Sequence, residues 1–291
     1  MYHKTTGYKV FSIFNHVLLA VAALLCILPL IHTLALSFSS RAAANANIVA
    51  LWPVDFTLDA YRKTFETPNF LNSIWISVMR TLSGTAIGML LIFLAAYPLS
   101  KDNRIFRSRT FYSWFFIITM LFNGGLVPNY IVVQKLGLMN TMGALIFPLA
   151  VNVWLLVLML NFFRNVPKEL EEAALIDGAG QLRILFSIYL PISMPAVATL
   201  SLFTMVFHWN SWFDGLIYMT HENKYPLSTF LQTILVQIDS SQLSSGREMM
   251  DISNRTVKAA QIFIGALPIL LVYPFLQKYF VKGIVLGSVK E

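Results

Sequence analysis

Six stretches of mainly apolar residues, each long enough to cross a bilayer, recur along this chain of 291 residues. An α-helix needs about 20 such residues to span the hydrocarbon core, where it satisfies its own backbone hydrogen bonds. The stretches therefore predict an all-α polytopic membrane protein with six transmembrane helices. We expect these helices over residues 17–36, 71–99, 110–127, 142–162, 194–217 and 259–280, forming one transmembrane domain over residues 17–280.

The composition argues against a soluble globular protein. Hydrophobic residues make up 57% of the chain and charged residues only 12%, against about 25% charged in an ordinary soluble domain. The single cysteine, Cys26, excludes a disulfide framework or a thiolate metal cluster. The net charge of +7 comes from Lys and Arg residues dispersed between the apolar stretches, which does not favour nucleic-acid binding. Membrane lipid is therefore the expected surrounding.

The first apolar stretch allows a second interpretation. Lys4 and Lys9 precede it, and Ala35, Leu36 and Ser37 close it, a pattern that resembles a secretory signal with its cleavage site. The stretch is about 20 residues long, however, which is long for the apolar part of a signal peptide and suits a transmembrane helix. We therefore retain it as the first of six spans.

The basic residues predict the orientation. With the N-terminus inside, twelve Lys and Arg residues lie in cytoplasmic connections and eight lie outside. Four of the twelve fall in the short connection 101–109, the kind of loop that the positive-inside rule weighs most. The parts expected in the cytoplasm are both termini (residues 1–16 and 281–291) and the connection 163–192, and those expected outside are the loops 38–70 and 218–257.

The connection 163–192 carries the signals of a short helix. Pro167 suits its first position, and three glutamates follow in the first turns, where the helix dipole favours negative charge. Gly178 can end the helix in a left-handed conformation, so we expect a helix over residues 167–177. The glutamates are Glu169, Glu171 and Glu172.

A second short helix is expected over about residues 181–189, ended by Pro191. On the first helix, Leu170, Ala173 and Ala174 should share one face because of their i, i+3, i+4 spacing. The second helix is expected to present Leu182, Leu185 and Ile188. On physical grounds, the two helices could either dock on a partner protein or rest on lipid headgroups as an amphipathic loop.

Seven residues of this connection form one spaced pattern: Glu172, Ala173, Ala174, Gly178, Ile188, Leu190 and Pro191. All seven match the EAA signature of binding-protein-dependent ABC importer permeases, which the chain therefore resembles. The resemblance implies the type I importer permease fold and assigns the seven residues to docking on a cytoplasmic ATPase. Glu172 is then expected to make a polar contact with the ATPase, whereas Glu169 and Glu171 are expected to be solvated.

Further positions share a second pattern: Trp209-Asn210, Tyr225-Pro226-Leu227, Ala259-Ala260 and the segment 277–283. They resemble the smaller permease of carbohydrate importers of the maltose type. The resemblance implies a heterodimer with a homologous second permease, two ABC ATPase subunits that bind ATP and Mg, and an extracytoplasmic solute-binding protein. It also brings Gly283, Gly287 and Lys290 toward the ATPases, with a disordered tail as the alternative.

The segments 51–53 and 56–58, with the tail, resemble a subgroup of oligosaccharide permeases that includes alginate importers. The implied function is translocation of an oligosaccharide across the membrane, driven by the partner ATPases, with an acidic and a neutral sugar both left open. A secondary transporter is the alternative class. It is less favoured because no internal repeat is evident and Asp214 is nearly alone as an acidic residue in its span.

Polar residues inside the spans are candidates for the substrate path, because an Arg, Lys or Asp at a helix centre costs about 2.5–3.5 kcal/mol. Arg80 in the second span could hold a carboxylate in a bidentate manner, or it could snorkel or pair with an acidic partner. The fifth span offers aromatic faces for sugar rings and polar groups for hydroxyls, although Trp is also typical of the membrane interface and Asp214 could lie near water. Its candidates are His208, Trp209, Asn210, Trp212 and Asp214.

The chain lacks the motifs of common catalytic sites. No Gly-x-x-x-x-Gly-Lys-Ser/Thr, His-Glu-x-x-His, Cys-x-x-Cys or Gly-x-Ser-x-Gly pattern occurs in it. We therefore expect no catalytic residue, no metal site and no cofactor bound by this chain itself. ATP hydrolysis is expected on the partner subunits.

Overall fold

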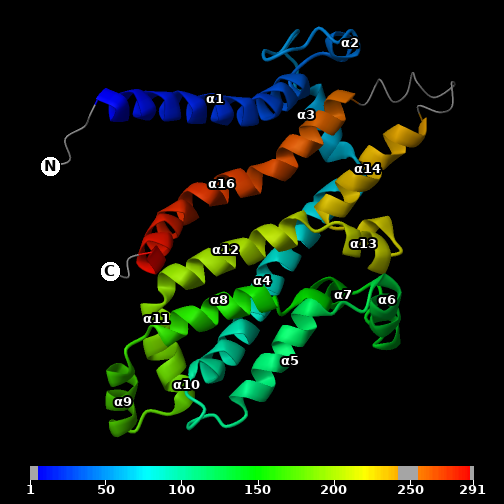
Figure 1. Ribbon diagram of the computed structural model, residues 1–291. Coiled ribbons are helices and arrows are strands. Elements are labelled where there is room, and N and C mark those ends of the chain that lie inside the picture. The colour runs from blue at the N-terminus through cyan, green and yellow to red at the C-terminus, as the bar shows by residue number, and fades with distance from the viewer. Residues whose placement is uncertain (1–5, 242–254, 289–291) are drawn as a thin grey trace. The chain divides into compact units, whose positions relative to one another are not determined.

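The computed structural model describes the backbone of residues 6–241 and 255–288, and the side chains of residues 6–234, 255–272 and 274. All regular elements in these ranges are helices, as expected for an all-α protein (Figure 1). The chain divides into two compact units. The first comprises Met1–Phe70 and Leu231–Leu267, and the second comprises Leu71–Phe230 and Pro268–Glu291.

The first unit contains the long N-terminal helix and the short helices that follow it. Arg255 holds part of this unit together, because its guanidinium Nη1 donates to the carbonyl oxygen of Ala44 at 3.2 Å. Thr64 also donates to the carbonyl oxygen of Val257 at 3.4 Å. The helices are α1 (Thr6–Ser37), α2 (Arg41–Asn45) and α3 (Asp59–Glu66), with parts of α14 (Leu227–Ser241) and α16 (Arg255–Ser288).

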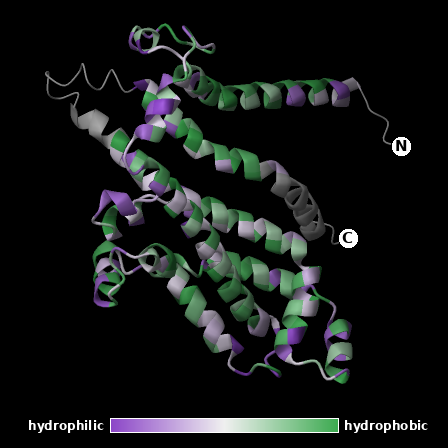
Figure 2. Cartoon of the chain, turned by 180° about the vertical axis from the view of Figure 1, so that it is seen from behind, coloured by the Kyte–Doolittle hydropathy of each residue, from purple (hydrophilic) through white to green (hydrophobic). Residues whose placement is uncertain are grey.

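Helix α1 has the surface of a lipid-facing span. It is hydrophobic along most of its length (Figure 2), and none of the residues in its most apolar window is buried within the chain. Helix α1 begins at Thr6, before the expected start of the span at residue 17. Val10, Phe11 and Phe14 extend the apolar run toward the N-terminus, and no proline interrupts the helix before Pro29.

The second unit is organised around the long helix α4, against which shorter helices pack (Figure 1). The elements are α4 (Phe70–Ser100), α5 (Arg109–Leu121), α6 (Leu126–Lys135), α7 (Met142–Ile146), η1 (Phe147–Leu149), α8 (Val153–Arg164), α9 (Lys168–Ile176), α10 (Gln181–Ile184), the π-helical turn η2 (Leu185–Tyr189), α11 (Leu190–Ile192), α12 (Met194–Asn210), α13 (Phe213–Tyr218) and η3 (Glu222–Lys224).

The described residues contain three long apolar helices and three bent helix pairs that could each serve as one span. The long helices are α1, α4 and the Arg255–Val272 part of α16. The pairs bend by 116° between α5 and α6, by 55° between α7–η1 and α8, and by 87° between α10–α11 and α12. Six spans are thus compatible with the structure, but the expected third, fourth and fifth spans are not continuous helices.

Glycine, proline and capping residues explain the breaks. Gly125 has a φ of +87°, a conformation that glycine adopts readily, and it separates α5 from α6. Pro148 lies in the 3₁₀ turn η1, and the side chain of Asn152 then accepts from the backbone N–H of Trp154 at 3.0 Å to start α8. Apolar composition identified these segments as spans but carries no information on where a span bends.

The core of the second unit lies where the C-terminal half of α4 meets α8 and residues 184–200. Ile92, Met159, Phe163 and Ile184 are each at most 1% exposed there. By contrast, large apolar residues such as Leu121 remain 80% exposed on the outer helices, as expected for a surface that faces lipid. The polar connection 163–192 is therefore anchored at its ends by the best-packed part of the unit.

The loops between the helices of the second unit lie at two opposite ends of it. At one end, Lys168 of α9 pairs with Asp102 of the connection 101–109 at 2.7 Å. At the other end, the Asn140 side chain accepts from the Thr220 backbone N–H at 2.7 Å. The two connections that were predicted to be cytoplasmic are thus on the same side. The tail predicted over 281–291 is helical as far as Ser288, and Lys290 lies outside the described residues.

Candidate functional site

Helix α9 presents the first part of the seven-residue pattern and ends as expected. Gly178 has a φ of +76°. The N–H of Ala179 donates to the carbonyl oxygen of Ala174 at 2.9 Å, and the N–H of Gly178 donates to that of Leu175 at 3.0 Å. These two bonds define a Schellman motif, for which glycine is the preferred residue. Pro167 is the N-cap residue, so α9 starts at Lys168, one position after the expected helix start.

One edge of α9 is exposed and largely apolar. Ile176 is 87% exposed, and Leu170 and Leu175 are each nearly half exposed. Glu172 and Ala173 are also exposed, whereas Ala174 packs against the core. Of the three residues predicted to share one face, Leu170 and Ala173 are thus exposed, and only Ala174 packs against the core. An exposed apolar edge beside a free glutamate has the composition of a protein-docking surface.

The second helix departs from the prediction because of a wide turn. Residues 185–189 form the π-helical turn η2, and the helix continues through Pro191 to Ile192 before it bends at Ser193. A proline lacks an N–H and clashes with the carbonyl of a preceding α-helical turn, and a π turn relieves both constraints. Pro191 therefore does not end the helix. Ile188 and Leu190 pack against the core, and Pro191 is exposed.

The π turn also changes which side chains face inward. Leu185 is 1% exposed and Ile184 is fully buried, whereas Leu182 is 64% exposed. Of the three residues that the predicted helix presents, Leu182 is thus exposed and Leu185 buried, and the prediction of an uninterrupted α-helix over residues 181–189 is wrong. Tyr189 becomes buried instead, at 3% exposure.

A buried ionic cluster, which the sequence did not predict, lies beneath α9. The ammonium Nζ of Lys101 contacts Glu171 Oε1 at 2.6 Å and donates to the Tyr189 hydroxyl at 2.9 Å. That hydroxyl in turn donates to Glu171 Oε2 at 2.6 Å. The expectation that Glu171 is solvated is thus wrong, since only 9% of its side chain is exposed. Lys101 is 70 positions away in the sequence, so no local pattern connects them.

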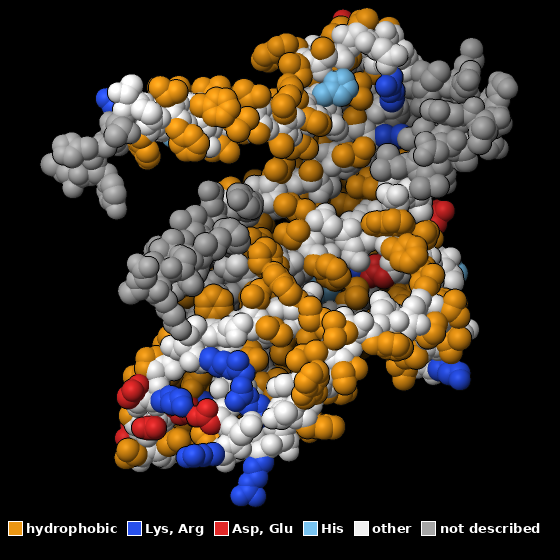
Figure 3. Space-filling model, in the orientation of Figure 1, with side chains coloured by type: hydrophobic (Ala, Val, Ile, Leu, Met, Phe, Trp, Pro, Cys, Tyr) orange, Lys and Arg blue, Asp and Glu red, His pale blue; other side chains and the backbone are white. Residues whose placement is uncertain are grey.

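Burial controls the protonation of this cluster. It lowers the pKa of the Lys101 ammonium below its ordinary value, while the hydrogen bond and the charge of Glu171 act in the opposite direction. Burial and the bond to Glu171 both raise the pKa of the Tyr189 hydroxyl. Tyr189 therefore stays protonated and remains a donor to the carboxylate. The surface around the cluster is rich in charged side chains, as Figure 3 shows for the end of the unit that carries α9.

The substrate-path candidates Arg80 and Asp214 pair with each other. Arg80 is fully buried, its Nη2 contacts Asp214 Oδ2, and its Nη1 donates to the carbonyl oxygen of Ser211 at 3.0 Å. Asp214 Oδ1 also accepts from the Ser211 hydroxyl at 3.1 Å. Of the roles considered for Arg80, the structure thus shows pairing with an acidic partner rather than a guanidinium open to a ligand.

The other candidates on the fifth span do not converge. His208 is 2% exposed and lies against Gly84, where an added Cβ would be 2.6 Å from His208 Nε2. Trp209 is buried, whereas Asn210 and Trp212 are exposed. These four residues therefore point into different surroundings.

A cavity of about 660 Å³ lies beside Asp214, between the α5–α6 break, η1 and the α12–α13 break. Its wall combines amide, hydroxyl and carboxylate groups with aromatic rings, which suits a ligand rich in hydroxyl groups. No Lys or Arg is among its lining residues. The lining residues that the sequence did not indicate as candidates include Asn123, Asn129, Phe207, Ser211, Phe213 and Tyr218.

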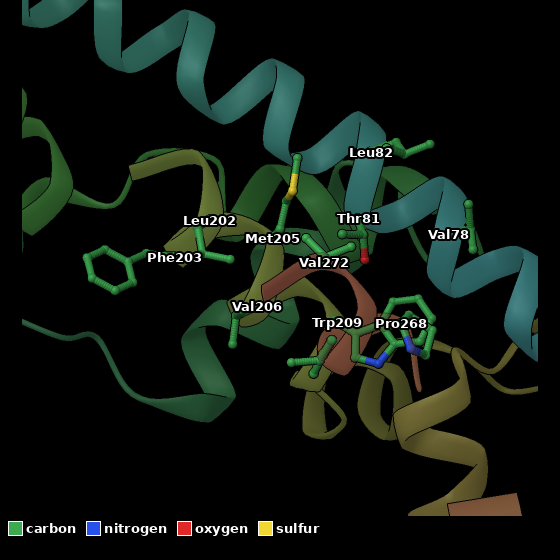
Figure 4. Close-up of a pocket in the computed structure, with 11 residues that line it drawn as sticks. Val78, Thr81, Leu82, Leu202, Phe203, Met205, Val206, Trp209, Pro268 and Val272 are labelled. Carbon is green, nitrogen blue, oxygen red and sulfur yellow. The ribbon is translucent and has the colours of Figure 1, made fainter. Parts of the chain in front are cut away.

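A second hollow is apolar. It has a volume of about 480 Å³ and includes Trp209, Leu202 and Val206 of α12, Val78 of α4 and Pro268 of α16 in its wall (Figure 4). Trp209 thus belongs to an apolar groove, and Asp214 to the polar cavity. The interruption Asn123-Gly124-Gly125 within an apolar stretch is the one sequence signal that could have indicated the polar cavity.

Comparisons with known proteins identify relatives over nearly the full length of the chain. Residues 1–286 match the family model described as "Binding-protein-dependent transport system inner membrane component". The chain is 41% identical to the polygalacturonan/rhamnogalacturonan transport system permease protein YtcP of Bacillus subtilis (strain 168), over 97% of this chain and 99% of the relative. It is 29% identical to the trehalose/maltose transport system permease protein MalG of Thermococcus litoralis, over 96% of this chain and 98% of the relative.

A solved structure shares the fold. A chain from the crystal structure of a bacterial ABC transporter involved in the import of the acidic polysaccharide alginate matches with a TM-score of 0.87 and 32% sequence identity. The match covers 96% of this chain and 100% of that chain.

Proposed function

Because the chain belongs to the family of binding-protein-dependent transport system inner membrane components, we propose that it is the smaller permease of an ABC importer for acidic oligosaccharides. The full-length similarity to sugar permeases is the observation that carries this proposal. The chain supplies the membrane path, and ATP is hydrolysed on separate subunits that bind ATP and Mg. The complete importer contains a homologous second permease, two ABC ATPases and an extracytoplasmic solute-binding protein, and it operates in the cytoplasmic membrane.

Helix α9 and the segment that follows it would dock on an ATPase at the cytoplasmic side. The exposed edge around Ile176 and the exposed Glu172 supply apolar and charged contacts for this partner. The basic connection 101–109 meets α9 at the same end of the unit, and short basic loops favour the cytoplasmic side. Both termini then also lie in the cytoplasm. ATP-driven closure of the ATPases displaces α9 and thereby opens the path outward, and hydrolysis resets it.

Two substitutions test this docking role. Gly178→Pro imposes a negative φ where the helix end requires +76°, and Glu172→Lys reverses the charge of the docking edge. We expect both variants to insert normally, to co-purify with little ATPase and to lose uptake. Gly178→Asn, which tolerates the left-handed conformation, and Glu222→Lys, at the opposite end of the unit, are the matched controls and should retain the ATPase. Normal uptake by Glu172→Lys and Gly178→Pro would disprove the docking role.

The acidic cargo is supported by the substrates of two relatives, polygalacturonan/rhamnogalacturonan and alginate. The polar cavity beside Asp214 is the proposed place for part of the sugar, with Asn123 and Asn129 as hydroxyl partners. Since Arg80 is already paired with Asp214, a carboxylate of the sugar would be recognised by the second permease or by the solute-binding protein.

A sugar panel tests the cargo. The assembled importer is reconstituted in proteoliposomes with its solute-binding protein, and uptake and ATP hydrolysis are measured with trigalacturonate, trimannuronate and maltotriose. We expect ATP-dependent uptake and stimulated hydrolysis with at least one uronate trisaccharide and neither with maltotriose. Uptake of maltotriose alone would refute the acidic cargo but not the importer, and ATP-independent uptake would refute the importer itself.

A further inference from the structure

We propose that Lys101, Glu171 and Tyr189 act as a positioning clamp that carries the displacement of α9 into α4. This inference rests on the proposed function, because it concerns how movement of the docking helix reaches the membrane path. Two of the three residues lie outside the seven-residue pattern and the third, Tyr189, occupies an unspecified position within it.

The three side chains form a closed ring of charge-assisted bonds. Lys101 donates to both partners, Tyr189 donates to Glu171, and the three distances lie between 2.6 and 2.9 Å. The residues come from three separate segments, namely the position directly after α4, the first turn of α9 and the π turn η2. Bonds to charged groups are the stronger ones in proteins, and they are stronger still when water is excluded. The ring therefore fastens three segments at one point.

Aromatic rings enclose the lysine. Its Nζ lies 4.0 Å from the ring centroid of Tyr97 and 4.2 Å from that of Tyr189. Tyr97 and Phe163 both pack edge-on against Tyr189, at 5.0 and 5.5 Å between centroids. Tyr97 also donates to Gln181 Oε1 at 2.7 Å, and this bond links α4 to α10. Water therefore has little access to the hydrogen bonds among Lys101, Glu171 and Tyr189. A rotation of α9 alone would leave a buried charge without its partner.

Helix α4 is suited to relay the movement. It runs without a break for 31 residues, which corresponds to about 46 Å. About 30 Å from Lys101 along this axis, Arg80 connects the same helix to Asp214 at the α12–α13 break, beside the polar cavity. A displacement of α9 that is transferred at Lys101 therefore has a rigid path to the cavity wall.

The chain provides a matched control next to the clamp. Lys168 of α9 and Asp102 of the connection after α4 form an ion pair at 2.7 Å, so they join the same two parts of the chain. Their side chains are 72% and 59% exposed, whereas those of Lys101 and Glu171 are 7% and 9% exposed. An exposed pair of this kind contributes little because water and salt screen it. Only the buried cluster should thus matter for transferring the displacement of α9 to α4.

The test compares two double variants in the full importer, reconstituted with its solute-binding protein and trigalacturonate as probe. Lys101→Met with Glu171→Gln replaces the buried pair by neutral side chains of similar size, so that no lone charge is buried. Lys168→Gln with Asp102→Asn removes the exposed pair. The readout is the number of trisaccharides transported per ATP hydrolysed, together with the amount of ATPase that co-purifies. Uptake by the wild-type importer tests the proposed function alone. A failure of the proposed function can therefore be distinguished from a failure of the clamp proposal.

We expect the buried double variant to assemble normally and to lose at least about fivefold in sugar transported per ATP, in the range of known coupling effects. The exposed double variant should keep the wild-type ratio. An unchanged ratio in the buried variant would overturn the proposal. So would a loss of assembly in proportion to uptake, with the ratio intact, since that result indicates packing only. Tyr189→Phe, which keeps the rings and removes one hydroxyl, should lower the ratio to a smaller extent, and a wild-type ratio there would also count against the clamp.

Discussion

Two buried ion pairs attach helix α4 and the residue after it to the rest of the unit. They differ in how many of their hydrogen-bond donors have a partner. In the pair Lys101–Glu171, the tyrosine hydroxyl completes a closed ring of bonds. In the pair Arg80–Asp214, the guanidinium is fully buried, yet its Nε has no hydrogen-bond partner among the described residues. A closed ring can move only as a body, whereas a pair with an unused donor can exchange partners at a smaller cost.

The two ion pairs also differ in how easily the chain around them can rearrange. Asp214 lies at a helix break and lines the polar cavity, so the Arg80 pair adjoins a place where the chain can rearrange. Glu171 lies in the first turn of the short helix α9, with only 9% of its side chain exposed. The comparison suggests a division of tasks along one helix, with a fixed attachment at the end near α9 and an adjustable one near the cavity. Three substitutions test it.

The largest effect is expected from Arg80→Leu. This change leaves the Asp214 carboxylate without its cationic partner and removes the donor to the carbonyl oxygen of Ser211, although Asp214 Oδ1 still accepts from the Ser211 hydroxyl. Loss of one member of a buried pair costs about 3–5 kcal/mol. The yield of monodisperse protein in detergent and its thermal unfolding temperature should both fall sharply, and uptake should fall for every sugar. The double variant Arg80→Leu with Asp214→Asn should recover much of the stability. If the single variant instead folded normally and lost only acidic sugars, Arg80 would be a ligand for the sugar carboxylate.

A smaller loss is expected from Lys101→Met. Glu171 keeps the hydrogen bond from Tyr189 in this variant, so about 1.5–3 kcal/mol should be lost, the range for a hydrogen bond to a charged group. Thermal unfolding of the purified permease measures this difference against Arg80→Leu. Adding Glu171→Gln should restore part of the stability, because the remaining charge is removed. A larger loss of stability for Lys101→Met than for Arg80→Leu would contradict the expected order of the two ion pairs.

The smallest effect is expected from the exposed pair. Lys168→Gln should leave the thermal unfolding temperature unchanged within error, because Lys168 and Asp102 are both well solvated. The hydrogen bond and charge of Lys168 lower the pKa of Asp102, and this effect should weaken in high salt. A measurable drop in stability at moderate ionic strength would show that exposure does not separate the two kinds of pair.

Local features of the sequence predicted local structure well. The apolar stretches located the spans because bilayer thickness sets their length, and Gly178 marked the end of α9 because few residues adopt a φ of +76°. The rule that proline ends a helix failed at Pro191, since the π turn before it accommodates the ring. That turn depends on how residues 185–189 pack, which the sequence pattern does not contain.

Contacts between distant residues were not predictable in the same way. Arg80 and Asp214 are 134 positions apart, and Lys101 and Glu171 are 70 apart. Each of these residues had a reasonable local role, as a ligand, a topology signal or a solvated charge. Only the packing of α4 against α9 and α12 decides that they pair, and burial then makes the pairing obligatory.

The π turn η2 sets a strict limit on the length of this segment. Each residue of an α-helix turns the chain by about 100°, and the single π turn already accommodates one extra residue, so inserting a further residue between Ile184 and Tyr189 would change the phase of everything beyond it. Tyr189 would then point away from Lys101, although every residue type of the pattern would still be present. The nine-residue spacing between Gly178 and Ile188 is thus an angular requirement as much as a length, and an insertion there should be tolerated less than a substitution.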